Sequence, residues 1–148
     1  KNMKISLGCD HAGFELKKFI SEWLRSNGHQ VLDFGCYSTE NVDYPDFAYP
    51  AAEAVAAGVA DYGIVICGTG IGVSIVANKV ITIRCALCCN PETADLARRH
   101  NNANVLALGA RFLETAFAKE IVKSFIEGEF EGERQMIREK KIHSLTGW

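Results

Sequence analysis

Short apolar runs alternate along the chain with longer segments in which apolar residues recur at helical spacing. The short runs are typical of β-strands, and they cover residues 4–9, 29–35, 62–67, 82–89 and 104–110. Helical patterns occupy residues 13–28, 47–58, 70–79, 90–101, 112–128 and 131–145. Asn90, Pro91 and Glu92 form a good helix start, because they supply a cap, a suitable φ and a charge that matches the helix dipole.

Strands of almost continuous apolar character, each followed by a helix, predict a parallel sheet that is covered on both faces. With right-handed crossovers this is a Rossmann-like three-layer α/β/α sandwich around a five-stranded parallel sheet. The 148 residues suit one core, and we expect residues 1–148 to form a single domain. The last helix has few apolar positions, so it is either an arm that packs on a second subunit or a frayed tail.

Composition narrows the functional classes. The formal net charge is −2 and 23% of the residues are charged, which leaves no basic footprint for nucleic acid. The densest basic stretch, Arg138–Lys141, is interrupted by Glu139 and suits a solvated helix face. No apolar run approaches the roughly 18 residues that a membrane-spanning helix needs. We therefore expect neither nucleic acid nor a membrane as a partner.

The cysteines and the N-terminal stretch bear on the compartment. Cys85, Cys88 and Cys89 contain a C-x-x-C, but the run "IRCALCCN" that holds them predicts a buried strand. Buried thiols are common and unreactive, and no zinc-ribbon spacing is present. The stretch "KNMKISLGCD" lacks the apolar core of a secretory signal. We expect a protein of the reducing cytoplasm that binds no metal.

Polar side chains follow several of the predicted strands. In an open parallel sheet, ligands bind beyond the carboxyl ends of the strands, so these side chains should gather at one edge. They are Asp10, His11, Asp43, Cys67, Thr69 and Arg111. Their convergence predicts a binding or catalytic site there.

The stretch "ICGTGIG" at residues 66–72 is rich in glycine but fits neither common nucleotide motif. Ile75 or Val73 stands where a dinucleotide fingerprint needs its third glycine, and Val73-Ser74 stands where a phosphate loop needs lysine and a hydroxyl. The glycines still allow a tight strand-to-helix turn whose backbone N–H groups form an anion hole. A close-packed turn without a ligand is the alternative.

Cys67 lies beside this predicted helix N-terminus, where the dipole favours a thiolate and apolar surroundings oppose it. A thiolate next to an anion hole can take a proton from carbon while the hole holds the oxyanion that forms. This pairing suits an enolising reaction. A packed, inert thiol is the alternative interpretation.

Two further groups of polar residues lie on predicted helices. His100 falls at the end of a predicted helix, where it either stabilises the helix terminus or serves a site together with Asn101. Arg134 and Arg138 are four residues apart on one face of the last helix. Paired guanidinium groups suit a phosphate dianion, although a face salt-bridged by Glu131 or Glu139 is equally compatible with the sequence.

Five blocks occur in order along the chain, namely "GCDHAGFELK" (8–17), "VDYPDFA" (42–48), "ICGTGIGVSIVANK" (66–79), "ARRHNNANVLALGAR" (97–111) and "FEGERQMIR" (130–138). Together they resemble the family of type B ribose-5-phosphate isomerases, which also holds the galactose-6-phosphate isomerase subunits. The resemblance implies a metal-free, cofactor-free aldose–ketose isomerase that works through a cis-enediolate. The expected substrate pair is D-ribose 5-phosphate and D-ribulose 5-phosphate. A six-carbon phosphosugar such as allose or galactose 6-phosphate, or a non-catalytic sugar-phosphate binding module, is the alternative.

The resemblance also implies a role for each candidate residue. Cys67 would be the base, and His100 would open the sugar ring while Asp10 orders hydroxyl groups. The enediolate oxygens would be held by the loop residues Gly68, Thr69, Gly70, Ile71, Gly72 and Ser74. Asp43 and Tyr44 would line the site beside Cys67, and Asn101 would bind substrate oxygens. The phosphate would be bound by His11, Arg111, Arg134 and Arg138.

In the family that the chain resembles, the site forms between two subunits. Residues from about 130 to 148 would then be a C-terminal helical arm that reaches over from the partner in an obligatory homodimer. The resemblance leaves open whether dimers pair into tetramers. Two positions depart from the family's pattern, because Gln135 stands where histidine is frequent and Thr82 where glycine is frequent. Neither change removes a proposed catalytic group.

Overall fold

The computed structural model describes all residues from Lys1 to Trp148. The strands are β1 (Lys4–Cys9), β2 (Gln30–Asp33), β3 (Tyr62–Cys67), β4 (Cys85–Leu87) and β5 (Val105–Gly109). The helices are α1 (Phe14–Ser26), α2 (Pro45–Ala56), α3 (Ile71–Asn78), α4 (Pro91–Asn101), α5 (Thr115–Glu127) and α6 (Arg134–Thr146).

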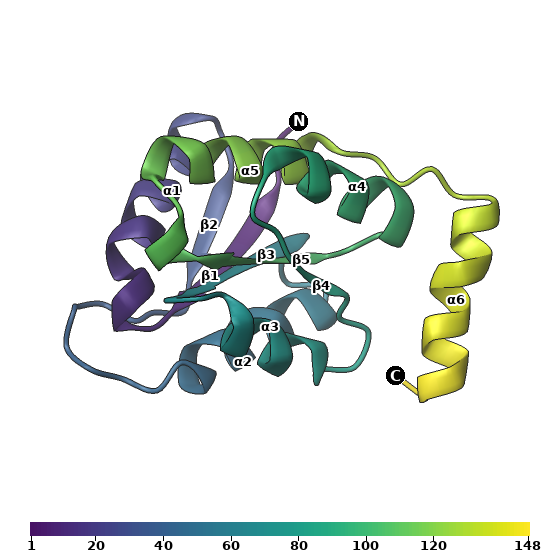
Figure 1. The fold of residues 1–148 in the computed structure, drawn as a ribbon, viewed down its shortest axis with the longest axis horizontal. Coiled ribbons are helices and arrows are strands. Elements are labelled where there is room, and N and C mark those ends of the chain that lie inside the picture. Colours follow the sequence, from purple (N-terminus) through teal and green to yellow (C-terminus); the bar gives the residue numbers. More distant parts are fainter.

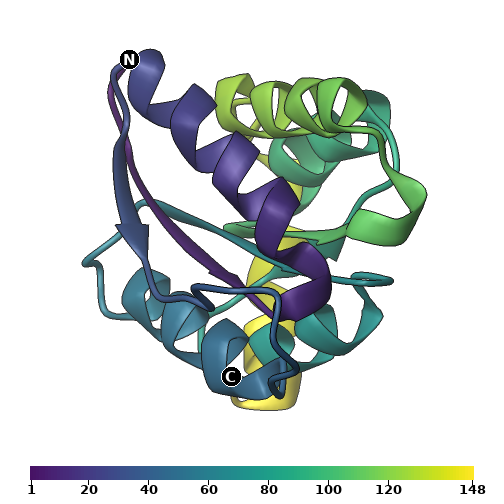
Figure 2. The ribbon, with the colours of Figure 1, turned by 90° about the vertical axis from the view of Figure 1, so that its left-hand side faces the viewer.

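The five strands form one parallel sheet in the order β2-β1-β3-β5-β4. Helices α1, α4 and α5 cover one face of the sheet, and α2 and α3 cover the other (Figures 1 and 2). The predicted three-layer α/β/α sandwich is therefore confirmed.

The central strand β3 explains why the apolar runs show little alternation. Ile64 and Ile66 belong to the apolar cluster that includes residues of α1, α4 and α5. Val65 and Cys67 belong to the cluster that includes residues of α2 and α3. Because helices cover both faces of the sheet, every second residue is buried on one side and the residues between them on the other.

The strand predicted at 82–89 departs most from the structure. β4 spans only Cys85–Leu87, lies at the edge of the sheet and is half-buried to exposed instead of buried. Thr82 has a φ of +70°, and the Arg84 N–H donates to the side chain of Asn104 at 2.7 Å instead of to a strand. The residues before Cys85 therefore form a turn.

Other boundaries shift by a few residues. β2 is shorter than 29–35, and α2 begins at Pro45. Residues 110–112 form a 3₁₀ turn, so α5 begins at Thr115. The last helix begins at Arg134 instead of residue 131, because Gly132 and Glu133 both have positive φ, +73° and +51°.

The predicted C-terminal arm stands apart from the sandwich. An extended segment after α5 leads to α6, which lies beyond the β4 side of the molecule (Figure 1). α6 contacts the rest of the chain mainly at α4. No helix of the chain has both the length and the apolar character needed to span a membrane.

Candidate active site

The order of the strands places the carboxyl ends of β1 and β3 side by side. Cys9 is the register partner of Ile66, so Asp10 and Cys67 follow as neighbours at this edge. The chain continues from β1 and β3 into helices on opposite faces of the sheet (Figure 2). Such a reversal is where open parallel sheets bind ligands.

The segment after β3 turns tightly into α3. Gly70 has a φ of +79°, and a Cβ at this position would lie 2.9 Å from the Leu108 carbonyl carbon and 2.5 Å from Leu87 Cδ1. A side chain is therefore excluded. The thiol of Cys67 is buried, and its Sγ accepts a hydrogen bond from the Gly70 N–H at 3.2 Å.

Hydroxyl groups occupy part of the loop that was predicted to be an anion hole. Thr69 Oγ1 accepts the Ile71 N–H at 3.2 Å, and Ser74 Oγ donates to the Ile71 carbonyl at 2.7 Å. The amides of Gly70 and Ile71 thus already have acceptors within the loop. The amides of Gly68, Thr69, Gly72 and Val73 donate no hydrogen bond within the chain. Those of Gly68 and Thr69 directly follow Cys67, so they are available as donors for an oxyanion next to its thiol.

The turn after β1 holds Asp10 and His11. Asp10 Oδ1 accepts two backbone amides of this turn, at 3.0 and 3.2 Å, and the Asp10 N–H donates to Ile66 at 3.3 Å. The carboxylate is therefore fixed beside the end of β3. His11 Nδ1 accepts the Val42 N–H at 3.1 Å, which leaves Nε2 as the protonated nitrogen of a neutral ring and a donor for an anion.

Tyr44 and Arg111 lie against the glycine loop. A Cβ on Gly72 would lie 2.5 Å from Tyr44 Cζ, and one on Gly68 would lie 3.0 Å from Arg111 Nε. Both side chains are exposed, so a ligand over the loop can reach them. Asp43 precedes Tyr44 and is also exposed.

His100 and Asn101 do not join this group within one chain. They end α4, which runs back towards the amino ends of the strands. Asn104, just downstream, accepts the N–H of Gly63 near the start of β3, whereas Cys67 ends the same strand. Within a single chain, His100 and Cys67 therefore lie at opposite ends of the sheet.

Arg134 and Arg138 lie on α6, which packs at this same end of α4. Both arginines are exposed. Glu131, one of the partners that the sequence allowed for them, is instead 2.7 Å from Arg99 and 3.6 Å from His100 Nε2. The contact between Glu131 and His100 was not predicted, because no spacing rule relates two residues that far apart.

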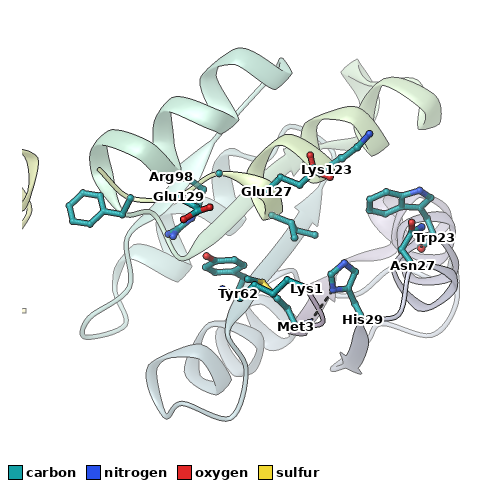
Figure 3. Close-up of a pocket in the computed structure, with 13 residues that line it drawn as sticks. Lys1, Met3, Trp23, Asn27, His29, Tyr62, Arg98, Lys123, Glu127 and Glu129 are labelled. Atoms are coloured by element: carbon teal, nitrogen blue, oxygen red, sulfur yellow. Dashed lines mark hydrogen bonds between the residues drawn. The ribbon is translucent and has the colours of Figure 1, made fainter. Parts of the chain in front are cut away.

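A cavity of about 610 Å³ lies at the opposite end of the sheet from Cys67. Residues from α1, α5 and the start of β3, including Trp23, Tyr62 and Lys123, line it (Figure 3). Its acidic and basic side chains are mixed, with Arg98 and Lys123 facing the same space as Glu127. This cavity holds none of the predicted site residues, so the candidate site rests on the strand-end groups and not on cavity volume.

Comparison with known proteins agrees with the fold. Residues 5–142 match the family described as Ribose/Galactose Isomerase. The chain is 46% identical to ribose-5-phosphate isomerase B of Escherichia coli over 142 residues, which are 96% of this chain and 95% of that protein. The structure of Clostridium thermocellum ribose-5-phosphate isomerase B matches with a TM-score of 0.96 at 48% identity, covering 98% of each chain.

A second solved structure holds a ligand. It is ribose-5-phosphate isomerase B from Mycoplasma genitalium with bound ribulose-5-phosphate, and it matches with a TM-score of 0.93 at 44% identity over 97% of this chain and 96% of that one. Since these similarities extend over almost the whole sequence, the chain belongs to the ribose/galactose isomerase family.

Proposed function

We propose that the protein interconverts D-ribose 5-phosphate and D-ribulose 5-phosphate through a cis-enediolate. The observation that carries this proposal is Cys67, a buried thiol at the end of the central strand with the free amides of Gly68 and Thr69 beside it. Aldose–ketose isomerisation needs a base that moves a proton between C1 and C2, and donors that stabilise the enediolate oxygens. The names of the relatives and the ribulose-5-phosphate bound by one of them support a pentose substrate.

Each group of the strand-end site has a step to perform. The Cys67 thiolate takes the proton from C2 of the aldose and returns it to C1, while the hydroxyl proton moves from O2 to O1. The loop amides and the Thr69 hydroxyl stabilise the enediolate oxygens during this exchange. Asp10 accepts hydrogen bonds from sugar hydroxyls, and Tyr44 covers the loop. His11 Nε2–H and the Arg111 guanidinium bind the phosphate. None of these steps requires a cofactor.

The remaining groups could reach this site only from a second copy of the chain. His100, Asn101, Arg134 and Arg138 lie at the other end of their own sheet, so we propose a homodimer in which each copy lends them to its partner. Exposed apolar side chains support such an assembly, because Ile137 and Leu145 on α6 are 63% and 83% exposed. In the dimer, His100 would open the sugar ring and the two arginines would complete the phosphate site.

We propose that the protein acts in the cytoplasm. All cysteines of the chain are free, which supports the reducing cytoplasm as the site of the reaction.

A coupled assay with ribose 5-phosphate in the presence of a chelator tests the activity. We expect turnover by the wild type and a loss on the order of 1,000-fold in Cys67→Ala, which is within the range for removing a positioned base. Cys89→Ala, which changes an exposed cysteine, is the matched control and should retain activity. Cys67→Ala activity within a few-fold of the wild type would place the base elsewhere.

The same assay should be run on allose 6-phosphate and galactose 6-phosphate, because the family description includes both ribose and galactose isomerases. We expect kcat/KM to be highest for the pentose. A higher value for either hexose would assign the protein to the six-carbon substrates. Binding of all three sugars without turnover of any would support a binding module.

Mixing two inactive variants tests whether Arg134 and Arg138 of one chain act at the site of its partner. In hybrids of Cys67→Ala with the double variant Arg134→Ala/Arg138→Ala, one of the two sites combines an intact Cys67 with intact arginines. We expect activity to return when subunits exchange. If exchange is shown by native mass spectrometry and no activity returns, the arm does not act on the partner.

A further inference from the structure

Four side chains outside the strand-end site connect α6 to the turn after α4, and we call them the latch: Arg84, Asn102, Glu139 and His143. Arg84 Nε donates to the Asn102 carbonyl at 2.8 Å, and Arg84 Nη1 lies 2.9 Å from His143 Nε2. Arg84 Nη2 is 3.9 Å from Glu139 Oε1, which also accepts the Asn102 side-chain amide at 2.9 Å. One guanidinium therefore binds the turn and the arm at the same time.

The latch is well shielded from solvent although α6 is mostly exposed. The side chains of Arg84 and Glu139 are only 17% and 14% exposed. Burial lowers the pKa of Arg84, and the nearby Glu139 carboxylate opposes that shift. A guanidinium can only donate, so His143 Nε2 must accept and the ring must be neutral, with its proton on Nδ1. That nitrogen is buried without a partner.

The latch residues are close in sequence to the groups that each chain of the proposed dimer supplies to its partner's site. Asn102 lies two residues after His100, and Glu139 directly follows Arg138. Glu131 provides a second attachment, because its N–H donates to the Arg99 carbonyl at 3.0 Å and its carboxylate lies 3.6 Å from His100. The arm is thus attached to the end of α4 at two points, and His100 lies at one of them.

We propose that Arg84 is a positioning residue, which holds α6 against the turn after α4 so that one chain presents His100, Arg134 and Arg138 to its partner's site as a single rigid unit. The inference rests on the proposed function of that site. Arg84 itself does not touch substrate. It acts through the geometry of the arm, because a misplacement of about 1 Å in a binding group can cost on the order of 100-fold in rate.

Hydrogen exchange measured by mass spectrometry tests whether Arg84 holds α6 against the turn after α4. This measurement does not depend on enzyme activity. In Arg84→Gln we expect amides of residues 134–146 to exchange at least about tenfold faster than in the wild type, since the latch's hydrogen bonds suppress local opening. Residues 62–67 of the central strand should be unchanged. Arg25→Gln, which also removes a side-chain hydrogen bond of an arginine, should leave residues 134–146 unchanged. Equal exchange in Arg84→Gln and the wild type would overturn the proposal.

The acceptor role of His143 gives a conservative rescue. A glutamine side chain can place an acceptor oxygen near the position of an imidazole Nε2, so His143→Gln should keep the arm protected from exchange. His143→Ala lacks an acceptor and should lose that protection. Loss of protection in both variants would contradict the hydrogen bond from Arg84 as the holding contact.

Kinetics separate positioning from mere stability. In Arg84→Gln we expect KM for ribose 5-phosphate to rise by about ten- to a hundredfold, with a smaller change in kcat, because the displaced arginines bind the phosphate. Arg84→Lys keeps the positive charge but not the fork of guanidinium donors. Its KM should therefore lie between the KM values of the wild type and Arg84→Gln. Faster exchange of the arm with unchanged KM would overturn the positioning role. If the wild type does not isomerise the sugar, the proposed function fails, and the exchange data still decide whether Arg84 holds the arm.

Discussion

Two glycines with the same backbone conformation occupy different surroundings. Gly70 and Gly58 have φ values of +79° and +77°. A Cβ on Gly70 would meet backbone atoms of Leu108 and Gly109 within 3.0 Å, whereas a Cβ on Gly58 would meet nothing within 4 Å. At Gly58 only the positive φ favours glycine, whereas at Gly70 the close approach of the loop to β5 adds a steric reason. Comparing the two positions therefore measures these two effects separately.

We predict that Gly58→Ala lowers the free energy of unfolding by about 1–2 kcal/mol, the cost of a left-handed alanine. Gly70→Ala should cost about 1–3 kcal/mol more, because its new methyl group overpacks against backbone that cannot move aside. Urea denaturation of both variants measures the difference. Equal losses would mean that the loop has room for a side chain.

The pKa of Cys9, the residue directly before Asp10, makes the free energy of unfolding depend on pH in the alkaline range. Burial and the thiol of Cys36, whose Sγ is 4.0 Å away, raise the pKa of Cys9 from 9.0 to about 12. A raised folded-state pKa means that the unfolded chain releases this proton first as the pH rises. The contribution of Cys9 is therefore fully present below pH 9 and is lost progressively between about pH 9 and pH 12.

We expect the free energy of unfolding to fall over that interval, and to fall less steeply in Cys9→Ala. Burial also raises the pKa of Cys85 and Cys88, so part of the slope should remain in this variant. Cys89→Ala, at an exposed thiol, should keep the wild-type slope. A Cys9→Ala slope equal to that of the wild type would contradict the assignment.

At the scale of elements, α4 matters because it carries His100 away from the Cys67 edge. The predicted start of this helix is confirmed, since the Asn90 side chain accepts the Thr93 N–H at 2.8 Å. The helix ends at Asn101, and the next residue, Asn102, adopts a φ of +51° and accepts Arg98 Nη1 at 3.1 Å through its side chain. Both ends are therefore set by side-chain hydrogen bonds.

Asn90→Ala should lower the free energy of unfolding by about 1 kcal/mol, the usual effect of losing an N-cap. Asn90→Asp should restore the lost stability, because aspartate supplies the same acceptor and a charge that suits the helix N-terminus. Thermal unfolding followed by circular dichroism measures both. A stable Asn90→Ala variant would show that tertiary contacts alone hold the helix start.

At the scale of the whole molecule, the arm exposes more apolar surface than a solitary helix favours. Met136, Ile137, Ile142 and Leu145 are all at least 40% exposed on α6. Ile71 and Ile75 on α3, next to the glycine loop, are 53% and 55% exposed. These side chains are the surface that a second copy would cover in the proposed dimer.

Ile137→Glu should weaken self-association, because a charge would be buried in the interface without a partner. Analytical ultracentrifugation should show a lighter species at a given concentration, with isomerase activity reduced in parallel. Val59→Glu changes a valine that is 54% exposed in the turn after α2, and it should leave the assembly unchanged. An unaltered mass for Ile137→Glu would exclude this face of α6 from the interface.

The sequence by itself determined the sandwich, the helix start at Asn90 and the neighbourhood of Asp10 and Cys67. These follow from local rules, since periodicity predicts the elements and the parallel sheet places every strand end at one edge. The prediction of a buried strand at 82–89 was wrong for a physical reason, because apolar content cannot distinguish a buried strand from an edge strand that is preceded by a turn.

Only the tertiary structure decided where residues distant in sequence from Cys67 lie and which side chains they contact. It separated His100 from Cys67, because α4 runs back along the sheet, and it paired Glu131 with Arg99 and His100. It also placed Arg84 between the α4 turn and α6. Such contacts join residues that are 18 to 59 positions apart, so they depend on how the helices pack and leave no signal in local spacing.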